Sequence, residues 1–179
     1  MELHQKIPAL RSFKNRHYSK NNMKGEQVET AKQTVSIRRA KVSDYSACLP
    51  LFNTLYHGDI GTNFKQVYEE FVKSKNSIVL LAACSNRIMG LLVGSFHLDL
   101  DWEGKIAKID AIIVEEAYRR QGVGENLFQF FVSYARQKQC NAIVSRVNIK
   151  NVIAQVFHIS LGFMKAHTLE YILDLKKQL

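Results

Sequence analysis

The chain has 179 residues, 46% of them hydrophobic and 23% charged, a balance typical of one globular domain with a hydrophobic core. It has no apolar run near the ~18 residues of a membrane helix and opens without the apolar segment of a secretory signal, so we expect a cytoplasmic protein with no membrane partner. Its formal net charge of +9 keeps nucleic-acid binding among the alternative functions. Its three cysteines are widely spaced, which favours reduced, buried thiols over disulfides or a zinc site.

Much of the positive charge lies near the N-terminus. Six lysines and arginines precede Gly25, and Glu2 is the one acid before Glu26. We expect residues 1–34 to form a basic, mobile extension and residues 35–179 to form the folded domain. Because the extension has few aromatic residues beyond Phe13 and Tyr18, nucleic-acid binding is the weaker alternative.

The first half of the predicted domain consists of one strand, two helices and a hairpin. Apolar residues alternate in the strands and recur every three or four positions in the helices. Ser43 or Asp44 can cap the first helix, and glycines follow that helix. The predicted elements are a strand at 35–40, helices at 43–56 and 63–72, strands at 77–84 and 88–98 joined by a turn at 85–87, and a polar turn at 99–104.

The central stretch joins a β-branched strand to an amphipathic helix through a basic turn. Residues 109–114 predict the buried strand, and the helix extends to about Lys138. Between them lies Arg119-Arg120-Gln121-Gly122-Val123-Gly124, which we call the glycine turn. Glycines let main-chain N–H groups approach a ligand, and the free N–H groups of a helix start favour negative charge. The glycine turn therefore predicts a phosphate site.

The rest of the chain predicts a strand, a helix and a last strand. The strand covers residues 142–147, and Asn151 caps the helix after it. That helix ends near Gly162, which can take the left-handed conformation common after helix ends. The last predicted strand covers residues 171–175. This order, with a hairpin half and a strand-helix-strand half, indicates a single mixed α/β domain.

Four separate features together resemble the GNAT superfamily of N-acetyltransferases. They are the helix start at Ser43-Asp44, the Arg-x-x-Gly-x-Gly turn between strand and helix, Asn148 closing the next strand, and Asn151-x-x-Ala154-x-x-Phe157-x-x-x-Leu161-Gly162-Phe163. The glycine patterns of dinucleotide-binding and P-loop folds are missing. The resemblance covers residues 35–179 and implies a mixed α+β fold with a central, mostly antiparallel, splayed sheet flanked by helices.

The resemblance also implies an activity and a cosubstrate. The chain would transfer an acetyl group from acetyl-CoA to a primary amine by direct attack in a ternary complex, without a metal. Pantetheine would pair with the strand backbone, pyrophosphate would bind the N–H groups of the glycine turn, and a side chain at Gly124 would occupy the phosphate site. The implied cofactor-binding residues are Ile112, Ile113, Val114, Arg119, Arg120, Gln121, Gly122, Val123, Gly124 and Asn151.

Two side chains are candidates for proton transfer. In many family members a tyrosine four residues before the glycine of Leu-Gly-Phe protonates the thiolate, and His158 holds that position here. The alternative is a histidine on an ordinary helix face. Asp110 is the candidate base; strict alternation predicts it on the same strand face as Ile112 and Val114, opposite residues 109, 111 and 113. Its alternative role is an ion pair with Lys108 or Arg146.

The acceptor amine is not identified by the sequence. Acidic residues at 56–61 and 99–103, with Trp102, favour a cationic amine on a small molecule or a protein. Because the usual tyrosine is replaced, a catalytically weak CoA-binding or regulatory module is the alternative function. A homodimer also stays open.

Overall fold

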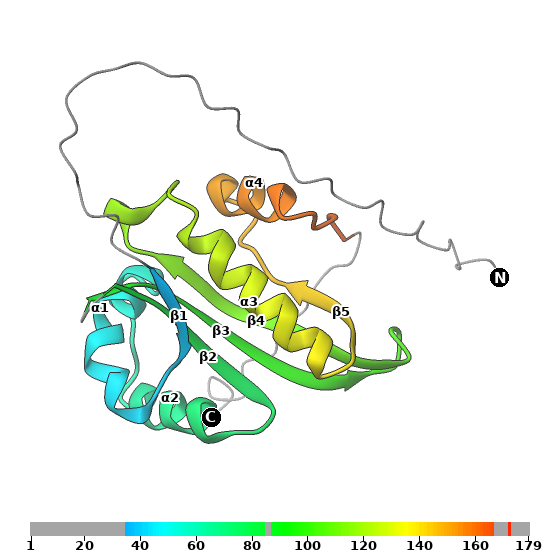
Figure 1. Cartoon of the computed structure of the whole chain (residues 1–179), viewed down its shortest axis with the longest axis horizontal. Helices are drawn as coiled ribbons and strands as arrows, with labels where there is room; N and C mark the ends of the chain where they lie inside the picture. Colours follow the sequence, from blue (N-terminus) through cyan, green and yellow to red (C-terminus); the bar gives the residue numbers. More distant parts are fainter. Residues whose placement is uncertain (1–34, 85–86, 167–171, 173–179) are drawn as a thin grey trace, which may run out of the picture. The chain divides into compact units, whose positions relative to one another are not determined.

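A computed structural model of the protein describes residues 35–84, 87–166 and 172, all within one compact unit, Gln33–Leu179. In this part of the chain, five strands form one sheet in the order β1-β2-β3-β4-β5 (Figure 1). Neighbouring strands are antiparallel except for the parallel β4–β5 pair. Three predicted segments lie outside the described residues: the extension at 1–34, the hairpin turn apart from Arg87, and the last strand at 171–175 apart from Ile172.

The order of the described elements confirms the predicted order. The elements are β1 (Ser36–Arg39), α1 (Tyr45–Leu55), α2 (Phe64–Lys73), β2 (Ser77–Cys84), β3 (Arg87–Asp99), β4 (Gly104–Val114), α3 (Val123–Gln137), β5 (Cys140–Ser145) and α4 (Val152–Ser160). Short 3-10 turns at Val42–Asp44 and Glu116–Tyr118 precede α1 and follow β4. β5 begins and ends two residues earlier than predicted, because its pairing with β4 begins at Cys140 and ends at Ser145.

Two core layers hold helices against opposite faces of the sheet. One layer packs α3 side chains, including Leu127 and Phe131, on alternate residues of β2 such as Leu80. The other packs α1 and α2 on the intervening residues of β2. All eight residues of β2 are buried as a result, which explains its uninterrupted apolar sequence.

A β-bulge at Asp110 reverses the alternation of β4. Val93 pairs with Ala111 while Gly94 pairs with Ile109, so Asp110 is the extra residue. Ile109 therefore packs in the α3 layer together with Ile112 and Val114, whereas Ala111 and Ile113 pack in the α1–α2 layer. The face predicted for Asp110 by strict alternation is wrong for this reason.

Gly94, beside the bulge on β3, leaves room for Phe131 of α3. A Cβ at this position would clash with the ring of Phe131, which is fully buried. Any side chain here would push α3 away from the sheet.

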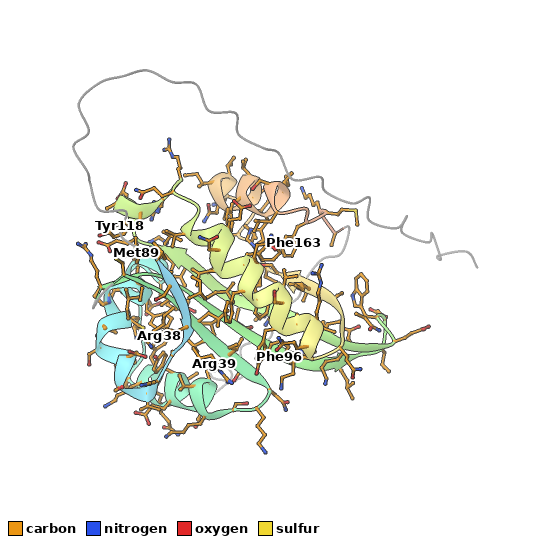
Figure 2. The ribbon with its side chains drawn as sticks, in the orientation of Figure 1. Arg38, Arg39, Met89, Phe96, Tyr118 and Phe163 are labelled. Carbon is orange, nitrogen blue, oxygen red and sulfur yellow. The ribbon has the colours of Figure 1, made fainter. Side chains whose placement is uncertain are left out.

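Asp44 links β1 to the start of α1 through its carboxylate. Arg38 (labelled in Figure 2) donates from Nη1 to Oδ2 at 2.7 Å and from Nη2 to Oδ1 at 2.8 Å. The backbone N–H of Lys41 donates to Oδ2 at 2.7 Å. The hydrogen bonds from Arg38, and then that from Lys41, hold the pKa of the Asp44 carboxyl below its ordinary value.

Asp44→Asn should lower the free energy of unfolding by about 1–2 kcal/mol at pH 7, a value reduced for solvent screening because Arg38 is partly exposed. A carboxyl whose pKa is lower in the folded state stabilises the fold above the unfolded pKa, and this contribution disappears as pH falls through the folded value. Urea unfolding from pH 7 down to about pH 3 should therefore show the variant and the native chain converging. Asp101→Asn, at an exposed turn position, is the control. A deficit that stays constant with pH would contradict the role of the ion pair.

Candidate active site

A cleft opens where β5 separates from β4. The two strands pair only as far as Ile109 and Ser145, and β4 continues to Val114. Within the described ranges, no strand pairs with residues 110–114 on that side. The chain runs from the end of β5 to α4 (Figure 1), and the cleft there has a volume of about 810 Å³. Its walls come from the ends of α1 and β5, the middle of β4, and α4 with the turn before it.

The cleft brings together several of the predicted site residues. Ile112, Asp110, Asn151 and His158 all line it. Ile113, Val114 and the glycine turn do not line it; they continue from β4 toward α3, with Gly124 contacting Val114 and Phe157 of α4. The predicted site thus has two parts along one strand, a cleft and a turn beyond it.

The glycine turn ends at an uncapped helix start. Gly122 has φ +80°, a left-handed value that costs other residues roughly 1–2 kcal/mol, and open space lies where its Cβ would be. The first hydrogen bond of α3 runs from the N–H of Asn126 to the carbonyl of Gly122. The N–H groups of residues 122–125 therefore have no acceptor within the helix, as at any helix start.

Arg119 and Arg120 are exposed beside this helix start. Arg119 donates from Nε to the carbonyl of Val114 at 3.1 Å, which holds the turn against the end of β4. Gln121 donates from Nε2 to the carbonyl of Ala117 at 2.8 Å, so its side chain folds back on the turn. The positive charges and the free N–H groups together make an environment that favours an anion.

Gly124 serves helix packing. A Cβ there would lie 3.1 Å from Cζ of Phe157 and 3.5 Å from Cγ2 of Val114. The first atom of a side chain at Gly124 would therefore press on Phe157 of α4, and the expectation that a larger side chain there would fill the phosphate site stays a prediction. The sequence motif cannot distinguish these two reasons for a glycine.

Asp110 has one paired and one unpaired carboxylate oxygen. Its Oδ1 forms an ion pair with Nζ of Lys108 at 2.9 Å, which is one of the two pairings that the sequence left open. Its Oδ2 is buried and has no hydrogen-bond partner among the described residues. The bulge at this residue turns the carboxylate to the border between the cleft and a second pocket under α1 and α2.

His158 is buried in a defined hydrogen-bond arrangement. Only 8% of the residue is exposed. Its Nδ1 lies 2.7 Å from the carbonyl oxygen of Ala154 and its Nε2 lies 2.9 Å from Oγ of Ser145. Because a carbonyl oxygen only accepts, Nδ1 carries a proton, and Nε2 is the nitrogen that can exchange one with Ser145. The ring also packs at 5.1 Å from the ring of Phe163 (labelled in Figure 2).

Ser145 also lines the cleft, although the sequence did not predict it as a site residue. It is the last residue of β5, lines the cleft and contacts His158. The two residues are thirteen positions apart on different elements, and a serine at a strand end carries no motif. The register of β5 against β4 and the packing of α4 bring them together.

Asn151 caps α4 as predicted. Its Oδ1 accepts a hydrogen bond from the N–H of Ala154 at 3.0 Å. Gly162, with φ +92°, confirms the predicted left-handed helix end. Asn148, predicted to close β5, instead shapes the turn after it, since its Oδ1 accepts from the N–H of Lys150 at 2.9 Å.

Of the two segments expected near the acceptor, one lines the cleft. Tyr56 and His57 do so, whereas residues 99–103 do not. The turn at 99–103 joins β3 to the first residue of β4, the end opposite the cleft, and the carbonyl of Trp102 accepts from Nδ2 of Asn141 at the start of β5. Its acidic side chains therefore lie outside the cleft.

The three cysteines differ in burial. Cys48 and Cys84 are buried as predicted, whereas Cys140 is half-buried, and all three are free. Burial raises the pKa of the Cys48 thiol to about 11.

In the described residues, no group of three or more His, Cys, Asp or Glu side chains could hold a metal ion. No helix of that same part is long and apolar enough to cross a membrane.

Comparisons with known proteins agree with this architecture. The model of the Acetyltransferase (GNAT) family matches residues 45–163, so the chain belongs to this family. No curated protein matches the chain in sequence.

Several solved structures share the fold. AAC(6')-Iy, in complex with the bisubstrate analogue CoA-S-monomethyl-acetylneamine, is 19% identical with a TM-score of 0.72 over 79% of this chain and 98% of that one. The aminoglycoside antibiotic 6'-N-acetyltransferase AAC(6')-Ih from Acinetobacter baumannii is 23% identical, with a TM-score of 0.71 over 79% and 98%. A transcriptional regulator from Bacillus halodurans C-125 is 23% identical, with a TM-score of 0.71 over 79% and 100%.

Proposed function

We propose that the protein is an N-acetyltransferase that moves the acetyl group of acetyl-CoA directly to a primary amine in a ternary complex. The observation that carries this proposal is the edge of β4 at residues 110–114, which no described strand pairs on the β5 side, beside a cleft lined by Asp110, Ser145 and His158. Family membership supports the acetyl transfer, and the CoA-derived analogue named for AAC(6')-Iy supports CoA as the carrier.

The cofactor fits the free backbone groups of this region. Residues 110–114 have main-chain groups available on the β5 side, which suit the amides of pantetheine. The N–H groups of residues 122–125 and the cations of Arg119 and Arg120 suit a pyrophosphate. Asn151 uses its Oδ1 for the helix cap and retains its Nδ2 donor for the cleft.

Proton transfer is the task of three side chains. A thioester is already activated, so the protein must accept a proton from the amine, stabilise the oxyanion and protonate the leaving thiolate. In our proposal Asp110 accepts the amine proton through its unpaired Oδ2, directly or through water. Ser145 gives its hydroxyl proton to the thiolate and receives one from Nε2 of protonated His158. Neutral His158 keeps its Nδ1 proton on the carbonyl of Ala154.

Replacing both Arg119 and Arg120 by glutamine should weaken acetyl-CoA binding by about 10- to 100-fold, since charge-assisted hydrogen bonds to phosphate are lost. Acetyl-pantetheine, which lacks the phosphates, should bind the variant and the native chain equally. Arg136→Gln, at an exposed position in the last turn of α3, is the matched control. Calorimetric titration measures each affinity. Equal weakening for both ligands would contradict a pyrophosphate on the glycine turn.

The function itself is tested by following thiol release from acetyl-CoA with a panel of primary amines, together with calorimetry for CoA. We expect CoA binding and amine-dependent release. Release that no amine raises above hydrolysis, with no CoA binding, would contradict the proposal.

A CoA-binding regulatory module is the second candidate. The histidine in place of the usual tyrosine favours it, and one protein of the same fold is described as a transcriptional regulator. CoA binding without turnover, in the native chain and in His158→Tyr alike, would favour this candidate.

A further inference from the structure

We infer that the acceptor is a primary amine with a compact apolar tail, held with its tail between α1 and α2 and its nitrogen beside Asp110. This inference rests on the proposed function and names its substrate class. The carrying observation is a second pocket, distinct from the cleft and bordering it at Asp110.

The second pocket, which we call the aromatic pocket, is walled by rings. It has a volume of about 80 Å³, and its aromatic walls are Phe52, Tyr56, Phe64, Tyr68 and Phe71. Phe52 and Phe64 meet edge to face with centroids 4.9 Å apart, and Tyr56 and Phe64 are 5.6 Å apart. These residues recur at helical spacing on α1 and α2, where the sequence pattern indicates an ordinary core face.

The ring cluster is not closed as a core would be. Tyr56 is 39% exposed and Val67, which also lines the pocket, is 45% exposed. Tyr56, Asp110 and Ala111 line both the aromatic pocket and the cleft. A ligand can therefore place its nitrogen at the cleft and its tail among the rings.

Of the described residues that line the aromatic pocket, Asp110 is the one that carries a carboxylate. Its Oδ2 is buried without a hydrogen-bond partner among the described residues, and such an oxygen is costly unless a ligand or water pairs with it. The pKa of Tyr56 is raised, first by burial and then by the charge of Asp110, which agrees with the hydroxyl lying near this carboxylate. An ammonium group can pair with Oδ2 and lie against the Tyr56 ring.

The rest of the lining disfavours a polar tail. The hydroxyl of Tyr68 already donates to the carbonyl of Lys41 at 3.1 Å, and the hydroxyl of Tyr56 lies near Asp110, at the border with the cleft. The other side chains of the lining, apart from Asp110, are hydrocarbon. Hydroxyls of a sugar amine would be buried here without partners, at a cost. The volume is about half that of a ~150 Å³ cavity that accepts benzene, so a tail of a few carbon atoms fits.

The test compares two amines of equal length, n-butylamine and 2-methoxyethylamine, which differ by one methylene replaced by oxygen, with an aminoglycoside as a third acceptor. We expect kcat/KM to be at least about tenfold higher for n-butylamine than for either polar amine. Turnover of the polar amines at an equal or higher rate would overturn the inference while leaving the proposed function intact. No turnover with any amine, polar or apolar, would contradict both.

Val67→Trp fills the aromatic pocket from its exposed rim. It should abolish the preference for n-butylamine without changing the calorimetric affinity for acetyl-CoA, and Lys65→Trp, exposed on the same helix outside the lining, should keep that preference. If Val67→Trp fails to fold, Val67→Ala gives the complementary test, because the enlarged rim should shift the preference toward longer amines. An unchanged amine preference in a folded Val67 variant would overturn the inference.

Discussion

Replacing His158 by alanine should lower kcat/KM by about 10²–10⁴-fold, the range for a lost acid or base, while acetyl-CoA affinity stays close to native. The physical reason is the hydrogen bond between Nε2 of the buried imidazole and Oγ of Ser145, which can carry a proton between His158 and the cleft. Initial rates over a range of amine concentrations measure the change.

Ser145→Ala distinguishes a relay from two independent roles. If His158 acts through Ser145, each single replacement removes the same pathway, and the double variant should be no slower than the slower single one. Losses that multiply in the double variant would contradict a relay. Ser133→Ala, on the exposed surface of α3, is a matched serine control.

The pH dependence of kcat/KM distinguishes proton transfer by His158 from a packing role, because a packing residue would not change the shape of the profile. Ser145 can turn its proton toward the cleft when Nε2 is protonated, because a neutral Nε2 accepts that proton instead. Protonated histidine is favoured at lower pH and the attacking neutral amine at higher pH, so kcat/KM should be bell-shaped. In His158→Tyr the upper limb should disappear or move far upward, since phenol stays protonated to about pH 10. A native profile with no upper limb, unaltered in His158→Tyr, would leave His158 a packing residue.

Asp110→Asn is expected to lower kcat/KM by a similar factor, about 10²–10⁴-fold. Asparagine keeps the size of the side chain and removes the negative charge that accepts the amine proton. Lys108→Gln is the matched control, because it breaks the ion pair and retains the carboxylate. The account predicts a much smaller loss in Lys108→Gln. Equal losses in both variants, accompanied by equal losses of stability in urea, would assign Asp110 a structural role.

Most of the fold could be predicted because it depends on patterns that lie along the chain. The uninterrupted apolar sequence of β2 predicts a buried strand, and the helical spacing of apolar residues on α3 predicts the face that packs on the sheet. Asn151 marks the start of α4 because its side chain caps the helix, and Gly162 marks the end because it takes the left-handed conformation. The glycine turn could be predicted as an anion site because its arginines and glycines are consecutive in the sequence.

The site could be predicted only in part because its geometry depends on tertiary contacts. One extra residue at Asp110 reverses the faces of β4, and alternation read along one strand contains no sign of it. On β3, Gly94 pairs beside the bulge and leaves room for Phe131, a contact between residues far apart in the sequence. Likewise, Ser145 meets His158 only after β5 and α4 have packed. The acidic turn at 99–103 was predicted to lie near the amine, but it precedes β4 and does not line the cleft, which lies along residues 109–112 of that strand.

The most direct test of the account follows the acetyl group itself. The native protein is incubated with acetyl-CoA that carries a deuterated acetyl group and with n-butylamine, and the amine, the released thiol and the intact protein are measured by mass spectrometry. The account predicts labelled N-acetylbutylamine and free CoA thiol in equal amounts, with no labelled acetyl group on the protein at any time during turnover. Thiol released without labelled amide, or a labelled acetyl-enzyme that forms and decays at the rate of turnover, would contradict direct transfer to an amine.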